Sequence, residues 1–250
     1  AQTKRSIAFM NSELKNLLII DIETVSVSSS FETLPENLRH HWERKAIQLG
    51  NDDEKSASDL YFEKAGIFAE FGKIIVISVG IFHEVEGEAA LRVTSFQDHD
   101  EVKLLYAFKV FLETKFNQQY LKLCGHNGKE FDFPFLCRRM IVNEVPIPQA
   151  LNLSGKKPWE VQHIDTMDLW KFGDKKNYTS LDLLTSLFDI DSSKSNIDGS
   201  QVNKVYYRDN QGLMEIVNYC QEDVIATAQV YLKLKGLPAV KKENITRVDQ

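Results

Sequence analysis

The chain has 250 residues, of which 43% are hydrophobic and 26% charged, and its formal net charge is −6 at pH 7. This composition is that of an ordinary globular protein with one large core or two small ones, and no apolar run approaches the roughly 20 residues that span a bilayer. The negative charge argues against a protein that coats duplex nucleic acid, but it leaves open an enzyme whose acidic site is offset by bound cations.

The three cysteines, Cys124, Cys137 and Cys220, are odd in number and lack a Cys-x-x-Cys spacing. The first ten residues lack the longer apolar stretch of a secretory signal. We therefore expect reduced thiols in a cytoplasmic protein that does not cross a membrane. No internal repeat or linker interrupts the sequence, which predicts a single domain over residues 1–250 with a core from about 17 to 235.

The first predicted element is a strand over residues 17–24, whose apolar run Leu-Leu-Ile-Ile leads into Asp21 and Glu23. Residues two apart on a strand point to the same side, so both carboxylates would project together beside a buried strand. Such a pair is costly unless a cation compensates it, and hard divalent ions such as Mg²⁺ prefer oxygen ligands. The pair predicts a metal site, whereas the same spacing at Asp52 and Glu54 lies in a polar run and predicts solvated surface.

Residues 28–70 are polar and lack the alternation of strands, which predicts a helical insertion over the edge of the sheet. The rest of the chain predicts strands first and then alternating helices and strands, which is typical of an α/β fold with a mixed five-stranded sheet flanked by helices. The further expected strands cover residues 73–82, 89–96, 121–125 and 161–164; the expected helices cover 35–49, 59–69, 100–116, 131–142 and 213–235, with short helices between 164 and 188 and a loop over 189–200.

A second acidic position follows the fourth predicted strand, in the run His126-Asn127-Gly128-Lys129-Glu130-Phe131-Asp132. Asp132 would lie in the first turn of the next helix, near the carboxyl edge of the sheet, where the sites of α/β proteins gather. An aspartate in that first turn can equally serve to complement the helix dipole.

The last predicted helix carries a third candidate, Tyr219 and Asp223, which are four residues apart and hence on one face. The same spacing occurs at Tyr178 and Asp182, where an exposed first-turn position is sufficient to explain the aspartate. We favour Tyr219 and Asp223 because they come last in a set ordered as Asp-x-Glu, Asp and Tyr-x-x-x-Asp.

This ordered set resembles the DEDD superfamily of 3′–5′ exonucleases in its tyrosine branch, and is most similar to the proofreading exonuclease domain of family B DNA polymerases. The resembling segments are LIIDIET at 18–24, GHNGKEFDFPFL at 125–136 and NYCQEDV at 218–224. The histidine branch would carry histidine where this chain has Asn218, which favours the tyrosine branch. The resemblance spans about residues 17 to 235 and implies a ribonuclease H-like fold; the 28–70 insertion has no counterpart in it.

The resemblance implies that Asp21, Glu23, Asp132 and Asp223 bind two divalent metal ions, Mg²⁺ or Mn²⁺. Four carboxylates suffice to hold two such ions about 4 Å apart, where the ions clamp a scissile phosphate between its attacking and leaving oxygens. Asp21 would bridge both ions, and Tyr219 would orient the attacking water. Because a phenol with a pKa of about 10 is protonated at neutral pH, we expect Tyr219 to position the water rather than to take its proton.

By the same resemblance, the backbone near Ile22 and Thr24 would contact the terminal nucleotide, and Asn127 and Phe131 would flank the strand, where an aromatic ring can stack on a base. The expected substrate is the 3′ end of single-stranded DNA, cleaved to 5′-mononucleotides in proofreading or DNA repair. Because nothing after residue 235 could form a polymerase domain, the enzyme would act alone or with a polymerase or repair partner.

Two alternatives stay open. An exoribonuclease could use the same carboxylates, because the motifs do not reveal how a 2′-hydroxyl would be discriminated. A catalytically silent ribonuclease H-like module could bind nucleic acid without cleaving it, although such a module has no need to crowd four acids.

Several residues, most of them between residues 156 and 176, allow both a functional and a structural explanation. Trp42, Trp159 and Trp170 could each stack on a base or simply pack against protein. Asp165 and Asp168 could join the site behind the metal ligands, although a helix cap is the simpler explanation for Asp165. Lysines in this stretch could guide a polyanion or form a solvated face; they are Lys156, Lys157, Lys171, Lys175 and Lys176.

Overall fold

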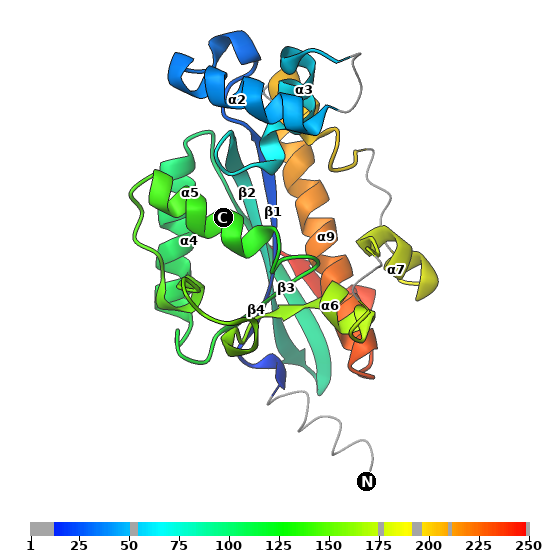
Figure 1. Cartoon of the computed structure of the whole chain (residues 1–250). Helices are drawn as coiled ribbons and strands as arrows, with labels where there is room; N and C mark the ends of the chain where they lie inside the picture. The colour runs from blue at the N-terminus through cyan, green and yellow to red at the C-terminus, as the bar shows by residue number, and fades with distance from the viewer. Residues whose placement is uncertain (1–12, 51–54, 175–177, 192–196, 210–211, 249–250) are drawn as a thin grey trace.

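The computed structural model describes residues 13–50, 55–174, 178–191, 197–209 and 212–248. Within them, six strands form one mixed sheet in the order β5-β4-β1-β2-β3-β6, and helices cover both of its faces (Figure 1). The predicted α/β class with a mixed sheet flanked by helices is confirmed, and the sheet has one strand more than the five expected. No helix in these ranges is long and apolar enough to cross a membrane.

The elements have the following bounds. The strands are β1 Leu17–Ser26, β2 Gly72–Val85, β3 Glu88–Gln97, β4 Lys122–Gly125, β5 Ile164–Asp165 and β6 Ile245–Arg247. The α-helices are α2 Glu36–Leu49, α3 Ala57–Lys64, α4 Glu101–Lys115, α5 Asp132–Val142, α6 Thr166–Lys171, α7 Leu181–Leu187, α8 Val202–Arg208 and α9 Gly212–Leu234.

Strand β1 is buried on both faces, as its unbroken apolar run predicts. Leu18 and Ile20 pack into a core with α4 and α5, whereas Leu17 and Ile19 pack into a core with α9. Because side chains alternate along a strand, Asp21 has the same parity as Leu17 and Ile19 and therefore points to the α9 side. The parity of the apolar residues thus decides which helix the acidic residues of β1 meet.

The pairing of β1 brings two segments that are distant in sequence to one edge of the sheet. It runs antiparallel to β2 and parallel to β4, with Ile19 opposite Cys124 as the last paired residues of the parallel ladder. The carboxyl ends of β1 and β4 therefore lie at the same edge. Asp21 and the turn that follows Gly125 meet there.

Helix α9 crosses the other face of the sheet closely (Figure 1). Its buried residues include Val224, whose Cγ1 would lie 2.8 Å from a Cβ added at Gly80 of β2. No real Cβ tolerates such a contact, so the glycine permits the close packing of helix on strand. This packing sets the distance between α9 and the end of β1.

The insertion predicted over residues 28–70 is helical and has its own small core. Trp42 of α2 is fully buried against Tyr61 of α3 and Phe71, and its indole N–H donates to the carbonyl oxygen of Ala57 at 2.8 Å. The insertion is tied to β1 by the Thr24 hydroxyl, which donates to the carbonyl of Gly66 at 2.7 Å. Its helices therefore stand directly beside the carboxyl end of β1.

Three local expectations differ from the structure. Strand β5 begins only at Ile164, because the Leu123 backbone N–H of β4 donates to the side chain of His163 rather than to a strand. Neither α8 nor β6 was predicted. Of the loop expected over 189–200, residues 192–196 lie outside the described residues, as do Asp52 and Glu54.

Candidate active site

A hollow of about 390 Å³ lies where the ends of β1 and β4 meet the middle of α9. All nine residues that the sequence predicted for metal binding, catalysis or substrate contact line it: Asp21, Ile22, Glu23, Thr24, Asn127, Phe131, Asp132, Tyr219 and Asp223. These residues come from β1, the turn after β4, the start of α5 and the middle of α9. The fold thus brings the predicted set together in space.

Asp21 and Glu23 project from β1 on the α9 side. One carboxylate oxygen of each lies within 4.8 Å of the other and of Cys220 Sγ, and Glu23 is only 8% exposed. The pairing of β1 with β2 shifts register between Glu23 and Thr24. Such an irregularity bends a strand and increases its twist, and here it follows directly after the second acid.

Asp132 is the first residue of α5 and is 4% exposed. Its Oδ1 accepts a hydrogen bond from the backbone N–H of Ile22 at 3.1 Å. Strand β4 pairs with β1 only as far as Ile19, so this carboxylate takes up a strand N–H that lies beyond the ladder. The bond draws Asp132 to the backbone between Asp21 and Glu23.

The turn between β4 and α5 is held by the buried carboxylate of Asp165. Its Oδ1 accepts from Asn127 N and Met167 N, both at 2.9 Å, and its Oδ2 accepts from Lys129 N at 3.1 Å. The cap expected of Asp165 is present in the bond to Met167, and the other two bonds hold Asn127 at a φ of 62°. Non-glycine residues in this conformation occur where the surroundings over-determine it.

Tyr219 and Asp223 lie one turn apart on α9 and face the same hollow. The tyrosine hydroxyl donates to the Asp223 carboxylate, which lowers the pKa of Asp223 against the stronger effect of burial. Burial raises the pKa of Tyr219 far above its ordinary value, and the charges of Asp223 and Glu23 raise it further. The phenol is therefore a neutral donor at any physiological pH.

All four carboxyl groups are disfavoured as anions. Burial raises the pKa of Asp21 and of Glu23 well above the ordinary range, and the neighbouring acids add to it. Burial also raises the pKa of Asp132 to about 7 and that of Asp223 to about 6. Bound divalent cations would offset both the cost of burying these charges and their mutual repulsion. A donor set made only of carboxylates fits hard ions such as Mg²⁺ and Mn²⁺.

Cys220 belongs to the site although no sequence pattern indicated a role for it. Its thiol donates to Asp21 Oδ2 at 3.2 Å, and it is fully buried. Burial raises the pKa of the thiol well above its ordinary value, as do the charges of Asp21 and Glu23. The sulfur is consequently a neutral donor that orients Asp21, and a protonated thiol is not a metal ligand.

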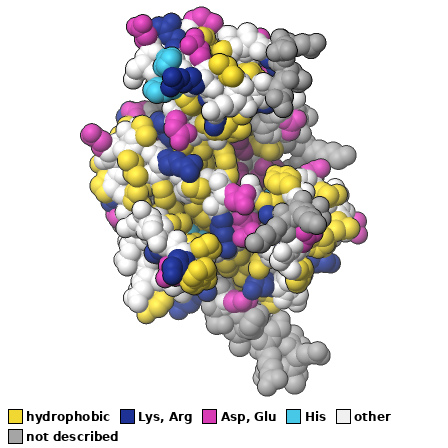
Figure 2. Space-filling model, viewed as in Figure 1, with side chains coloured by type: hydrophobic (Ala, Val, Ile, Leu, Met, Phe, Trp, Pro, Cys, Tyr) yellow, Lys and Arg dark blue, Asp and Glu magenta, His cyan; other side chains and the backbone are white. Residues whose placement is uncertain are grey.

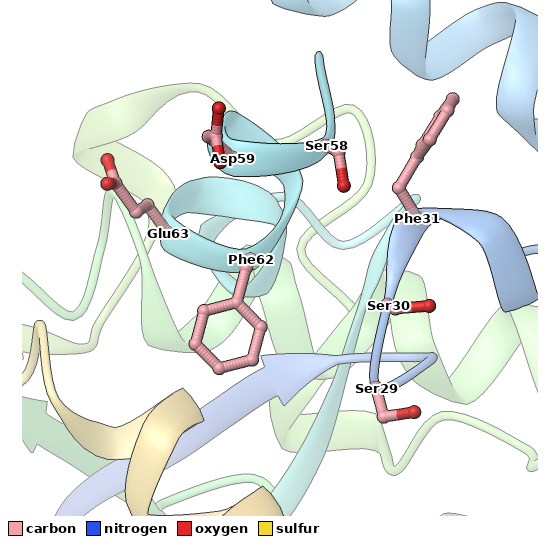
Figure 3. A pocket seen from close by; sticks show the side chains of 7 residues that line it. All are labelled: Ser29, Ser30, Phe31, Ser58, Asp59, Phe62 and Glu63. Atoms are coloured by element: carbon pink, nitrogen blue, oxygen red, sulfur yellow. The ribbon is translucent and has the colours of Figure 1, made fainter. Parts of the chain in front are cut away.

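The helical insertion supplies a wall of the hollow through Glu63, Gly66 and Ile67. A second hollow of about 320 Å³ opens inside the insertion and shares Glu63 with the first; Figure 3 shows its lining residues, Ser29, Ser30, Phe31, Ser58, Asp59, Phe62 and Glu63. No motif linked these residues to the site, because the insertion has no counterpart in the resembling family. That these residues line the hollow is evident only from the packing of the insertion against β1.

The remaining lining residues are His126, Tyr178, Gly199, Ser200 and Asn203. His126 is held through both ring nitrogens, by the Thr166 hydroxyl and by the carbonyl of Thr179, each at 2.9 Å. Tyr178 contributes an exposed ring at the rim, but Asp182 does not line the hollow. The competing Tyr-x-x-x-Asp pair thus lacks the arrangement that Tyr219 and Asp223 have.

Residues 67–245 match the model of a protein family described as a predicted 3′–5′ exonuclease related to the exonuclease domain of PolB. The matched range includes Asp132, Tyr219 and Asp223, whereas Asp21 and Glu23 precede it. Strand β2, which pairs with the strand that carries these two acids, lies inside the match. No curated protein matches the chain.

Proposed function

The chain belongs to this family of predicted 3′–5′ exonucleases related to the exonuclease domain of PolB, and from that membership we propose that it removes 5′-mononucleotides from the 3′ end of single-stranded DNA. The observation that carries the proposal is the convergence of Asp21, Glu23, Asp132, Asp223 and Tyr219 on one hollow. Crowded, buried carboxylates with raised pKa values are the arrangement expected of a site that works with cations.

We propose that the four carboxylates would hold two divalent ions, Mg²⁺ or Mn²⁺. When bound, such ions supply positive charge that stabilises the attacking and leaving oxygens of the phosphodiester. Two neighbours orient the carboxylates before any ion binds: the Cys220 thiol donates to Asp21, and the Ile22 backbone N–H donates to Asp132. Both contacts limit the reorganisation that binding requires.

Tyr219 orients the attacking water. Its hydroxyl stays protonated because burial and the adjacent carboxylates raise its pKa, so it does not act as a base. Its single proton goes to the Asp223 carboxylate, and its oxygen is left to accept a hydrogen bond from the attacking water. His126 is no substitute, because burial lowers its pKa and both of its nitrogens already have partners. The proton of the water therefore passes to solvent or to a carboxylate in the hollow.

The terminal nucleotide occupies the part of the hollow lined by Ile22, Thr24, Asn127 and Phe131. The Phe131 ring is half-buried and braced by Phe135, with ring centroids 5.3 Å apart, which suits stacking against a base. Asn127 Oδ1 is a buried acceptor without a partner among the described residues, and a donor on the nucleotide would satisfy it.

The working environment and partners form part of the same proposal. All three cysteines are free, which supports a reducing compartment such as the cytoplasm. We propose a polymerase or a repair protein as the partner, because the family is related to the exonuclease domain of PolB.

The test is a gel assay on single-stranded DNA labelled at either end, with Mg²⁺, Mn²⁺ or EDTA. We expect a metal-dependent ladder that shortens from the 3′ end, absent with Asp21→Ala and intact with Glu144→Gln, an exposed acid that serves as the control. RNA of the same sequence is assayed beside the DNA. Faster cleavage of the RNA would show that RNA, rather than DNA, is the substrate. Cleavage that persists in Asp21→Ala, or no cleavage of either polymer, would overturn the proposal.

A further inference from the structure

The three most exposed aromatic residues of the described part of the chain lie in the stretch that flanks β5 and α6. Trp159 is 77% exposed, Phe172 87% and Tyr178 70%, while the next most exposed aromatic residue, Tyr120, is 55% exposed. Large apolar side chains exposed together on a globular protein mark an interaction surface more often than isolated ones do. Their shared position therefore requires an explanation.

Lysines accompany these rings. Lys157 Nζ lies 5.3 Å from the centroid of the Trp159 ring, Lys156 precedes it, and Lys171 is the neighbour of Phe172. None of the three lysines forms an ion pair with a described carboxylate. On the face of the molecule that carries α5 and α6, Lys or Arg side chains adjoin hydrophobic ones (Figure 2). We call Lys156, Lys157, Trp159, Lys171, Phe172 and Tyr178 the lysine–aromatic surface.

The surface is continuous with the active-site hollow. Tyr178 lines both. His126, another lining residue, bonds to the hydroxyl of Thr166, the first residue of α6, at 2.9 Å. Lys171 ends this short helix and Phe172 follows it, whereas Lys156, Lys157 and Trp159 precede β5 in the chain. The surface therefore follows the segment that flanks β5 and α6, starting at the hollow.

We propose that the lysine–aromatic surface binds the single strand of DNA on the 5′ side of the nucleotide held in the hollow. Every unpaired base offers a π-face to an exposed ring, and the lysines offer charge to the phosphates between bases. Paired bases in a duplex cannot stack on these rings. The surface therefore selects single-stranded ends, an inference that rests on the proposed function and names its substrate.

The stacking part is tested by fluorescence anisotropy with a 12-nucleotide oligothymidylate in EDTA, where metal-dependent cleavage is absent. We expect Trp159→Ala and Phe172→Ala each to weaken binding about thirtyfold, the middle of the range for loss of one base–aromatic stack. Tyr120→Ala, an exposed aromatic elsewhere on the chain, is the matched control and leaves binding unchanged. Equal affinity of wild type and both variants would overturn the proposal, as would equally tight binding of a blunt duplex.

The electrostatic part is tested by the salt dependence of the same binding. Each lost phosphate contact reduces the slope of log K against log salt by about 0.7 for a single strand. We expect this reduction for Lys156→Gln and for Lys157→Gln, and an unaltered slope for Lys103→Gln, an exposed lysine on α4. Slopes that match wild type in both test variants would contradict phosphate contact.

Kinetics separate this proposal from the catalytic one. With the 12-nucleotide substrate, Trp159→Ala and Phe172→Ala raise KM and leave kcat unchanged. Both variants cleave a dinucleotide as wild type does, because it has only one nucleotide beyond the terminal one. Binding that the variants weaken, without any cleavage, would refute the proposed exonuclease activity but support DNA binding by the lysine–aromatic surface. Cleavage by wild type, with binding that the variants do not weaken, would support the activity and refute DNA binding by this surface.

Discussion

Asp21, Glu23, Asp132 and Asp223 share a hollow in which burial disfavours the charge of each one and the neighbouring charges repel it. Such an arrangement lowers the stability of the metal-free protein and is maintained only by the surrounding structure. Cys220 and the Ile22 backbone supply hydrogen bonds that fix two of these carboxylates without adding positive charge. At the residue scale, the site is thus preorganised for cations and strained without them.

The first prediction concerns that strain. Asp21→Asn removes one negative charge while its amide oxygen can still accept the bond from Cys220, so the variant gains about 1 kcal/mol of stability in EDTA. Thermal unfolding in EDTA should show a higher Tm for the variant than for wild type. Mn²⁺ should then raise the Tm of wild type far more than that of the variant. Glu144→Gln changes neither value, and a variant less stable than wild type in EDTA would contradict the interpretation.

The second prediction concerns Tyr219. Tyr219→Phe keeps the ring and removes the hydroxyl that orients water, which lowers kcat on the order of 100-fold, as misplacement of a reacting group does. The fold and the affinity for DNA are preserved because the ring still packs. Tyr120→Phe, an exposed position, is the control. A kcat equal to that of wild type would remove Tyr219 from the mechanism.

At the scale of elements, the short turn between β4 and α5 positions Asn127, Phe131 and Asp132 together. Asp165, from the neighbouring strand β5, binds three backbone N–H groups with its two oxygens and so clamps this turn. These hydrogen bonds hold the start of α5 in a fixed position against the edge of the sheet. Their loss would move three lining residues of the hollow at once.

The third prediction follows from that clamp. Asp165→Asn turns an NH₂ group toward a backbone N–H, which loses at least one bond; we expect a cost of about 1–3 kcal/mol and a lower kcat with a folded protein. Asp100→Asn is the matched control, since Asp100 caps α4 through Oδ1 alone and an asparagine keeps that cap. Urea unfolding and turnover of both variants provide the comparison. Equal turnover by the two proteins would exclude a positioning role for Asp165.

The sequence predicted those elements that have a strong local pattern. The β-branched run predicted β2, and the apolar run before Asp21 predicted β1. The order of the acidic residues along the chain predicted the set of side chains that lines the hollow. Strand β6 and helix α8 were not predicted, because they have only three and seven residues, respectively, which is too short for a clear hydrophobic periodicity. Glu63 and Cys220 could not be foreseen, because their place depends on how the insertion and α9 dock against β1.

At the scale of the whole molecule, the site depends on the packing of α9 and of α4 with α5 on opposite faces of β1. Buried polar groups elsewhere in this packing also tie stability to pH. His163 is 5% exposed; its Nδ1 accepts from Leu123 N, which leaves the proton on Nε2 to donate to the Ala150 carbonyl at 2.9 Å. The neutral ring therefore links β4 to the segment after α5.

The fourth prediction uses this histidine. Burial lowers the pKa of folded His163 to about 4, below its ordinary value of 6.5, so the unfolded state binds the proton first. The stability that the neutral ring provides is complete above pH 6.5 and is lost as the pH falls toward 4, by up to about 3 kcal/mol. Urea unfolding between pH 8 and 4 should show a flatter dependence for His163→Gln than for wild type. His40→Gln, an exposed position, should follow wild type; identical curves for all three proteins would contradict the assignment.

The most direct test of the central claim is the identity of the product released from unlabelled single-stranded DNA, measured by chromatography and mass spectrometry. With Mn²⁺ or Mg²⁺ we expect 5′-mononucleotides from the first time point, none in EDTA and none from Asp21→Asn. Release of internal fragments or 3′-mononucleotides, or the same products from Asp21→Asn, would contradict hydrolysis of the 3′-terminal phosphodiester by the carboxylates of this hollow.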